Sequence, residues 1–184
     1  MNRIATVAFL FLISCQTPIN QETISLEGEE VLVGEIDWEG LTSSPYRDWF
    51  VDGYKNYLVD TLTLSNLNES MENTDILLFM GTWCEDSQIE VPQFYKILDH
   101  VRFDLEHLST IALEKQEDGE LVSPQQQESG WEIGFVPTII FIQQGVEIGR
   151  ITEYPQRSLE KDMTEIINRA MADWVYFNLA VNLG

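Results

Sequence analysis

One cysteine stands where a strand gives way to a helix. Residues 76–80 form an apolar run that predicts a buried strand, and residues 85–98 carry apolar side chains at helical spacing. Cys84 lies between them, after Gly81-Thr82-Trp83. A thiol at that point faces unpaired backbone N–H groups and the positive end of the helix dipole, and both stabilise a thiolate. The alternative is a buried cysteine that acts only as a small apolar residue.

Two prolines favour the reactive interpretation. Pro92 falls inside the expected helix, where it removes a hydrogen bond and introduces a kink. Pro137 follows Val136 and immediately precedes residues 139–142, an apolar run that predicts a second strand. Residues 143–150 then predict a hairpin around Gly145.

These features, in this order, resemble the thioredoxin superfamily over residues 31–167. Ser87 stands where dithiol members carry a second cysteine, so the chain is most similar to the monothiol Trp-Cys-x-Asp-Ser proteins of Bacteroidota, in which serine is the normal residue. The resemblance implies an α/β thioredoxin-like fold, a central mixed β-sheet flanked by helices, with an N-terminal extension. It also implies a cis bond before Pro137 and contact between this proline and the thiol.

The expected chemistry is thiol–disulfide exchange, in which a thiolate attacks a disulfide sulfur and forms a mixed disulfide. Cys84 is the expected nucleophile. Ser87 can donate a hydrogen bond to the thiolate, but it cannot release the partner, so an external thiol must do so. The expected partners are protein or small-molecule thiols and disulfides. By resemblance, the Val136 backbone contacts an extended substrate and Trp83 shields one side of the sulfur.

Acidic residues next to the cysteine oppose its ionisation. Glu85, Asp86 and Glu90 are close to it in sequence, and no lysine or arginine is close enough in sequence to offset them. The same carboxylates stabilise the first helical turn, which is their structural interpretation. Asp86 belongs to the motif on which the resemblance depends, and the residues alone give it no separate role.

The N-terminus predicts export. Residues 1–14 are expected to be a lipoprotein signal peptide, because a short apolar run ends in Leu12-Ile13-Ser14-Cys15 and Cys15 would carry the lipid. An ordinary secretory signal and an uncleaved anchor are the alternatives. Residues 15–30 are expected to be a polar tether and residues 31–184 the folded domain. The protein would then be a lipid-anchored component of the cell envelope that faces the periplasm.

Composition narrows the remaining function classes. The chain has 184 residues and a formal net charge of −21. This charge argues against nucleic-acid binding and against electrostatic attachment to anionic lipid. Of its two cysteines, only Cys84 would remain a free thiol once Cys15 is lipidated. We find no signal for a metal or an organic cofactor, and we expect His100 and His107 to be surface residues.

Other segments are expected to support the site. Ser44 and Pro45 predict a helix start, followed by an aromatic stripe that favours core packing over ligand binding. Residues 31–38 predict an edge strand and residues 110–113 a further strand. Residues 114–130 form a polar insertion in which a short helix is expected. A final helix starts after Ser158, and residues 175–184 add an apolar extension that covers a sheet face or binds a partner.

Two functions remain open. The first is a membrane-tethered oxidoreductase with a single active-site cysteine. The second is a non-catalytic binding or scaffold lipoprotein with a thioredoxin-like fold, whose cysteine no longer reacts. A third candidate function is other thiol chemistry, such as peroxide reduction.

Overall fold

The computed structural model describes residues 18–65 and 67–182. It contains one mixed sheet of six strands in the order β1-β2-β4-β3-β7-β8, with a separate two-stranded hairpin, β5-β6. The strands are β1 Gln21–Ile24, β2 Glu30–Ile36, β3 Thr74–Met80, β4 Leu108–Ala112, β5 Glu114–Lys115, β6 Leu121–Val122, β7 Thr138–Gln143 and β8 Val146–Thr152. Strands β3 and β4 are parallel, and the other neighbouring pairs are antiparallel.

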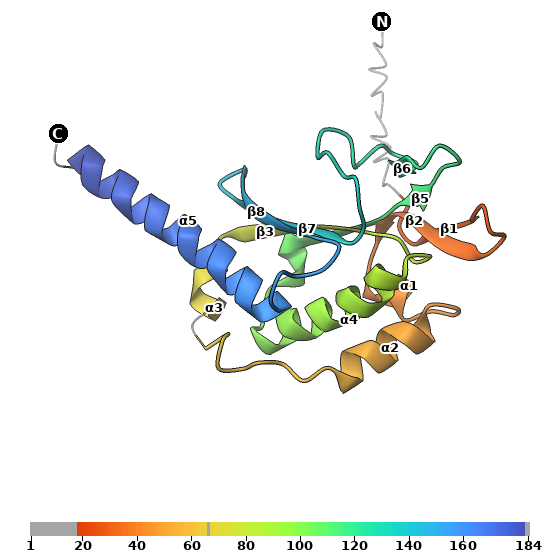
Figure 1. The fold of residues 1–184 in the computed structure, drawn as a ribbon, viewed down its shortest axis with the longest axis horizontal. Coiled ribbons are helices and arrows are strands. Elements are labelled where there is room, and N and C mark those ends of the chain that lie inside the picture. Colours follow the sequence, from red (N-terminus) through yellow and green to blue (C-terminus); the bar gives the residue numbers. More distant parts are fainter. Residues whose placement is uncertain (1–17, 66, 183–184) are drawn as a thin grey trace, which may run out of the picture.

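The helices gather on one side of this sheet. They are α1 Trp38–Leu41, α2 Arg47–Asn56, α3 Leu67–Ser70, α4 Glu85–His100 and α5 Leu159–Asn182, with a 3-10 turn at Leu105–His107. Figure 1 shows α1, α2 and α4 below the sheet and the β5-β6 hairpin above it. The chain is therefore an α/β protein whose mixed sheet is flanked by helices, as expected.

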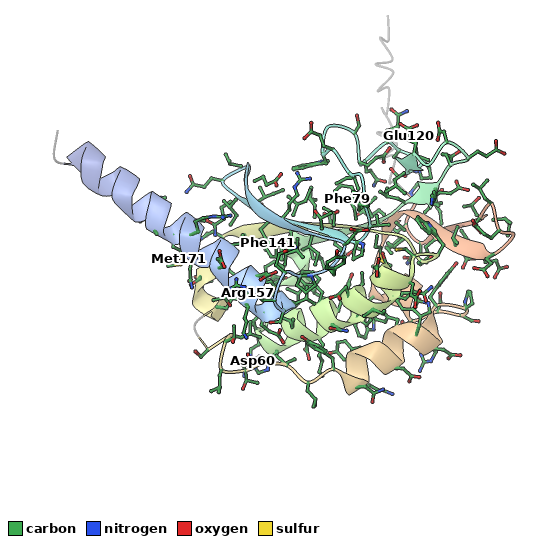
Figure 2. The ribbon with its side chains drawn as sticks, viewed as in Figure 1. Asp60, Phe79, Glu120, Phe141, Arg157 and Met171 are labelled. Carbon is green, nitrogen blue, oxygen red and sulfur yellow. The ribbon has the colours of Figure 1, made fainter. Side chains whose placement is uncertain are left out.

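Alternating side chains of the central strands build two apolar clusters. On β3, Ile76 and Leu78 face the helices, whereas Phe79 packs against the opposite face. Phe141 of β7 pairs with Ile76 and belongs to the helix-side cluster. Phe79 and Phe141, both labelled in Figure 2, are fully buried in clusters on opposite faces of the sheet. Burial on both faces explains why residues 76–80 of β3 are an unbroken apolar run.

The predicted tether is wrong in part. Gln21–Ile24 forms β1, which pairs antiparallel with β2, so the fold includes residues assigned to the tether. Strand β2, predicted at the edge, consequently lies between β1 and β4. Hydropathy misses β1 because Gln21 and Thr23 on one face are only half-buried, while Glu22 and Ile24 are exposed. Residues 1–17, with the predicted signal peptide and Cys15, lie outside the described residues.

Two local predictions also need correction. Helix α2 begins at Arg47 with Tyr46 as its N-cap, not at Pro45. The reason is a turn closed by the Arg47 N–H, which donates to the Ser43 carbonyl before the helix starts. In the insertion, the described structure contains the β5-β6 hairpin where a short helix was expected.

The C-terminal helix is confirmed. Ser158 precedes α5, and its hydroxyl accepts a hydrogen bond from the Lys161 N–H. Leu159, Met163 and Ile167 are buried in the helix-side cluster. Met171 is exposed, and in Figure 1 the end of α5 projects beyond the sheet. The described part of α5 therefore does not support the prediction that the C-terminal extension covers a sheet face.

Candidate functional site

A tight turn holds Cys84 at the start of α4. Strand β3 ends at Met80, and the Cys84 N–H donates to the Gly81 carbonyl at 3.0 Å, which closes the turn. Cys84 is the N-cap of α4, and its side chain makes no capping hydrogen bond. The Thr82 hydroxyl accepts from the Leu32 N–H of β2, so the turn is also bonded to a strand that lies beyond β4 in the sheet. The predicted position of the thiol at the helix start is confirmed.

Trp83 packs against the glycine of the same turn. A Cβ at Gly81 would approach atoms of the Trp83 ring to 2.7 Å, so only glycine fits there without a shift. The Trp83 Nε1–H donates to the Leu113 carbonyl at 2.8 Å, which fixes the ring. Trp83 and Cys84 both lie against the cluster on the face of the sheet away from the helices. This need for glycine was not recognised in the sequence, since it depends on where the Trp83 ring lies.

Cys84 meets Val136 at the cis-proline turn. The Val136–Pro137 bond is cis, as the resemblance implies. The Cys84 Sγ–H donates to the Val136 carbonyl oxygen at 3.2 Å. On the other side of the turn, the Glu153 N–H donates to the Pro137 carbonyl at 2.7 Å, and Thr138 Oγ1 donates to the Phe135 carbonyl. The structure thus brings residues 84 and 136, far apart in sequence, into direct contact.

Ser87 does not serve the thiol as expected. Its side chain is fully buried, and its Oγ accepts a hydrogen bond from the Gly81 N–H at 3.2 Å. Among the hydrogen bonds of the described residues, none joins Ser87 to Cys84. The predicted donation to the thiolate is therefore not seen, because the hydroxyl is turned towards the backbone of the preceding turn. Ser87 instead ties α4 to the end of β3.

The acidic residues of α4 lie in unlike environments. Glu85 and Asp86 are exposed in the first turn, where the helix dipole favours negative charge. Glu90 is half-buried, and burial, followed by repulsion from the Asp86 carboxylate, raises the pKa of its carboxyl. Within the described chain, the Asp86 side chain makes no hydrogen bond or ion pair, so its predicted place at the site rests on position alone.

Exposed apolar side chains occur in α4 and in the two loops that are bonded at the cis-proline. Phe135, two residues before the cis-proline, is 56% exposed. Ile89 of α4 is 47% exposed. Tyr154, which follows the residue bonded to the Pro137 carbonyl, is 58% exposed. These three residues were missed in the sequence, although an apolar residue in a loop next to a functional motif is a signal that could have found Phe135.

The two histidines are exposed, as predicted. His107 Nδ1 lies 2.8 Å from Asp75 Oδ1, and this hydrogen bond raises the pKa of the imidazole above its usual value of 6.5. Within residues 18–65 and 67–182, no cluster of three histidine, cysteine or acidic residues is arranged to hold a metal ion. Nor is any helix of this part of the chain long and apolar enough to span a membrane.

Comparisons with known proteins add little. No family model matches the sequence, and no curated protein matches it. A solved protein of unknown function from Pseudomonas aeruginosa is 15% identical with a TM-score of 0.49, over 76% of this chain and 93% of its own. An HIV epitope scaffold is 18% identical with a TM-score of 0.45, over 76% and 91%. Likeness at this level carries no argument about function.

Proposed function

We propose that this protein is a thiol–disulfide oxidoreductase that works through the single thiol of Cys84. The observation that carries this proposal is the contact between the Cys84 sulfur and the Val136 carbonyl, 3.2 Å away and next to cis-Pro137. The contact supports the proposal because it places a half-buried thiol at a helix start next to the Val136 backbone. An extended disulfide partner can form hydrogen bonds with that backbone.

The reaction proceeds in two exchanges. The Cys84 thiolate attacks one sulfur of a partner disulfide, forms a Cys84–partner mixed disulfide and expels the other sulfur as a thiolate. An external thiolate then attacks the partner sulfur of this mixed disulfide and expels the Cys84 thiolate. Net, one disulfide is exchanged for another, and Cys84 is regenerated. Ser87 has no part in the transfer.

We further propose that the fold is thioredoxin-like. Support comes from the element order: β3, a proline-containing helix α4, the parallel strand β4, cis-Pro137, and then the antiparallel pair β7-β8 followed by α5. Among these, the proline-containing helix, cis-Pro137 and the β7-β8 hairpin are the features on which the resemblance depends. The antiparallel strands β1 and β2 form the N-terminal extension.

Attachment to the cell envelope through a lipid on Cys15 remains part of the proposal. The residues that carry it, Leu12-Ile13-Ser14-Cys15, lie outside the described part of the chain. Since Gln21 already belongs to β1, the segment that joins Cys15 to the fold would hold five residues, roughly 20 Å when extended. Partners would then be thiols and disulfides close to the membrane surface.

The test is capture of oxidised partners. Full-length protein carrying Cys15→Ala is compared with the same protein carrying Cys15→Ala and Cys84→Ser, after incubation with an oxidised model protein and blocking of free thiols. We expect a mixed disulfide on non-reducing gels for the first protein and none for the second. Mass spectrometry should place the linkage at Cys84. Absence of the adduct in both proteins would contradict the proposal.

A binding module is the second candidate, favoured by the exposure of Phe135, Ile89 and Tyr154, which lie on α4 and in the two loops bonded at the cis-proline. If this is the function, Cys84→Ser leaves partner binding unchanged, whereas Phe135→Ser weakens it. If the oxidoreductase function is correct, Cys84→Ser abolishes the covalent adduct whatever happens to non-covalent binding.

A further inference from the structure

An aromatic pocket lies on the helix side of the sheet, apart from the thiol. Its cavity is about 500 Å³, within the usual range for small-molecule sites. Its walls come from α1, α2, α4 and the loop after α4: Trp38, Tyr54, Tyr95, Phe103 and Leu105. Cys84 packs against the apolar cluster on the opposite face, so this pocket is independent of the proposed oxidoreductase function.

The walls of the pocket are held in place by contacts behind them. Trp38 packs edge-on against Tyr54 with ring centroids 5.1 Å apart and lies 6.0 Å from the Tyr95 ring. The Tyr95 hydroxyl is bonded to Thr110 Oγ1 in the core. Trp38 nevertheless remains 40% exposed and Leu105 48% exposed. The pocket therefore presents a preformed apolar surface to solvent.

One cation and one carboxylate line the pocket, and the cation is available to a ligand. The Asp99 carboxylate lines it but already accepts the Tyr54 hydroxyl at 2.9 Å. Lys96 Nζ lies 4.5 Å from the centre of the Tyr54 ring. Arg102 is the second cation and lines the pocket directly. Asp99 and Arg102 are the charged residues among those that line the pocket, and of the two only Asp99 has a side-chain partner.

Arg102 is set apart from the other arginines. Among the arginines that the structure describes, it alone has a guanidinium without a hydrogen bond or ion pair. The guanidinium is bonded in the other four, Arg47, Arg150, Arg157 and Arg169. An unpaired guanidinium is a strong receptor for a carboxylate, which it can bind through two parallel hydrogen bonds.

Arg102 also lies in the turn that ends α4. Helix α4 ends in a Schellman motif, with the Phe103 N–H donating to the Leu98 carbonyl and the Arg102 N–H to the Asp99 carbonyl. Arg102 occupies the left-handed position of this motif, with φ of 55°, where glycine is favoured.

We propose that this pocket binds a small organic anion with a planar apolar body and one carboxylate. The body lies against Trp38, Tyr54 and Phe103, and the carboxylate is bound by the Arg102 guanidinium. The apolar walls exclude water from the ligand body, which strengthens the charge-assisted bond at the rim.

The test uses 2-naphthoate as the probe and 2-naphthamide as its neutral counterpart, with calorimetry and amide chemical shifts on the full-length protein. We expect naphthoate to shift the signals of Trp38, Arg102 and Phe103, and to bind about tenfold more tightly than naphthamide. Arg102→Gln should remove this preference. Arg47→Gln, which changes an exposed arginine outside the pocket, should leave binding unchanged.

Arg102→Gly separates binding from stability. Glycine suits the left-handed backbone, so this variant should keep or raise the unfolding temperature while it loses naphthoate binding. Equal affinity for naphthoate and naphthamide would overturn the proposal, as would unchanged binding in Arg102→Gln or tighter binding of 2-naphthylmethylammonium. Absence of binding at millimolar naphthoate would also overturn it.

Discussion

The Cys84 thiol donates a hydrogen bond to the Val136 carbonyl oxygen across 3.2 Å, and this bond joins the start of α4 to the turn before β7. An extended partner that donated its own N–H to the same carbonyl would compete with the thiol for it. In that event the sulfur would be released next to the partner. Binding of a segment and exposure of the nucleophile would therefore be coupled through one oxygen atom.

Ser87→Ala should destabilise the fold without removing reactivity. It leaves the N–H of buried Gly81 without its acceptor, and an unsatisfied buried donor costs about 1–3 kcal/mol. Urea unfolding measures the loss, and Ser129→Ala, at an exposed position, is the control. Mixed-disulfide formation by the folded variant should continue. Loss of the adduct with unchanged stability would instead show that the Ser87 hydroxyl acts on the thiol.

Gly81→Ala should displace the Trp83 ring. The added Cβ would lie 2.7 Å from ring atoms, so the bond between Trp83 Nε1 and the Leu113 carbonyl must stretch or break. We expect a loss of about 1–3 kcal/mol in unfolding free energy and a shift of the Trp83 indole signal. Gly134→Ala is a matched control, because nothing lies within 4 Å of its added Cβ. Equal effects of the two changes would contradict this interpretation of Gly81.

Cys84 should prefer cationic disulfides. Glu85 and Asp86 are exposed beside it in the first turn of α4, and each unit charge at about 8 Å in water changes a rate about twofold. Each of the two carboxylates speeds the cation about twofold and slows the anion about twofold, so cystamine should react roughly sixteenfold faster than 4,4′-dithiodibutyrate at low salt, and added salt should reduce the ratio. Glu85→Gln with Asp86→Asn should bring the ratio close to one. A faster reaction of the anionic reagent would show that other charges dominate.

Glu90→Gln should stabilise the protein at neutral pH. Burial and the Asp86 charge raise the pKa of Glu90 above its usual 4.5, so the folded state loses relative stability as pH rises from that value through the raised pKa. Glutamine avoids this loss. The unfolding temperature of the variant should exceed that of the parent at pH 7, and the difference should vanish well below pH 4.5. Lower stability of the variant at pH 7 would contradict the assigned cause.

Local signals were sufficient to predict much of the site. The helix start at Cys84 follows from the change of apolar spacing, and the cis bond at Pro137 follows from a resemblance carried by a short motif. The hydrogen bonds of Ser87 and Cys84 were not predictable in this way. Each joins segments whose relative position depends on the packing of the whole sheet.

The missed elements have a common cause. Strand β1 carries polar Gln21 and Thr23 on its half-buried face and its one apolar residue, Ile24, on the exposed face, so it has no hydropathy signal and is defined by its pairing with β2. Arg102 ends α4 in a conformation that normally marks glycine, which hides the Schellman motif from a search for glycine. In both places the backbone hydrogen bonds determine the structure. The side chains there are of types that seldom occur in a buried strand or at a left-handed helix end.

The most direct test of the central proposal is the rate at which Cys84 reacts with cystamine at pH 7. The measurement compares folded full-length protein carrying Cys15→Ala with a peptide of residues 79–90, whose thiol has no folded environment. We predict that the folded protein reacts faster, because the start of α4 holds the half-buried sulfur in one position beside the cis-proline turn. A rate equal to or below that of the peptide would contradict an oxidoreductase function and would favour the binding module.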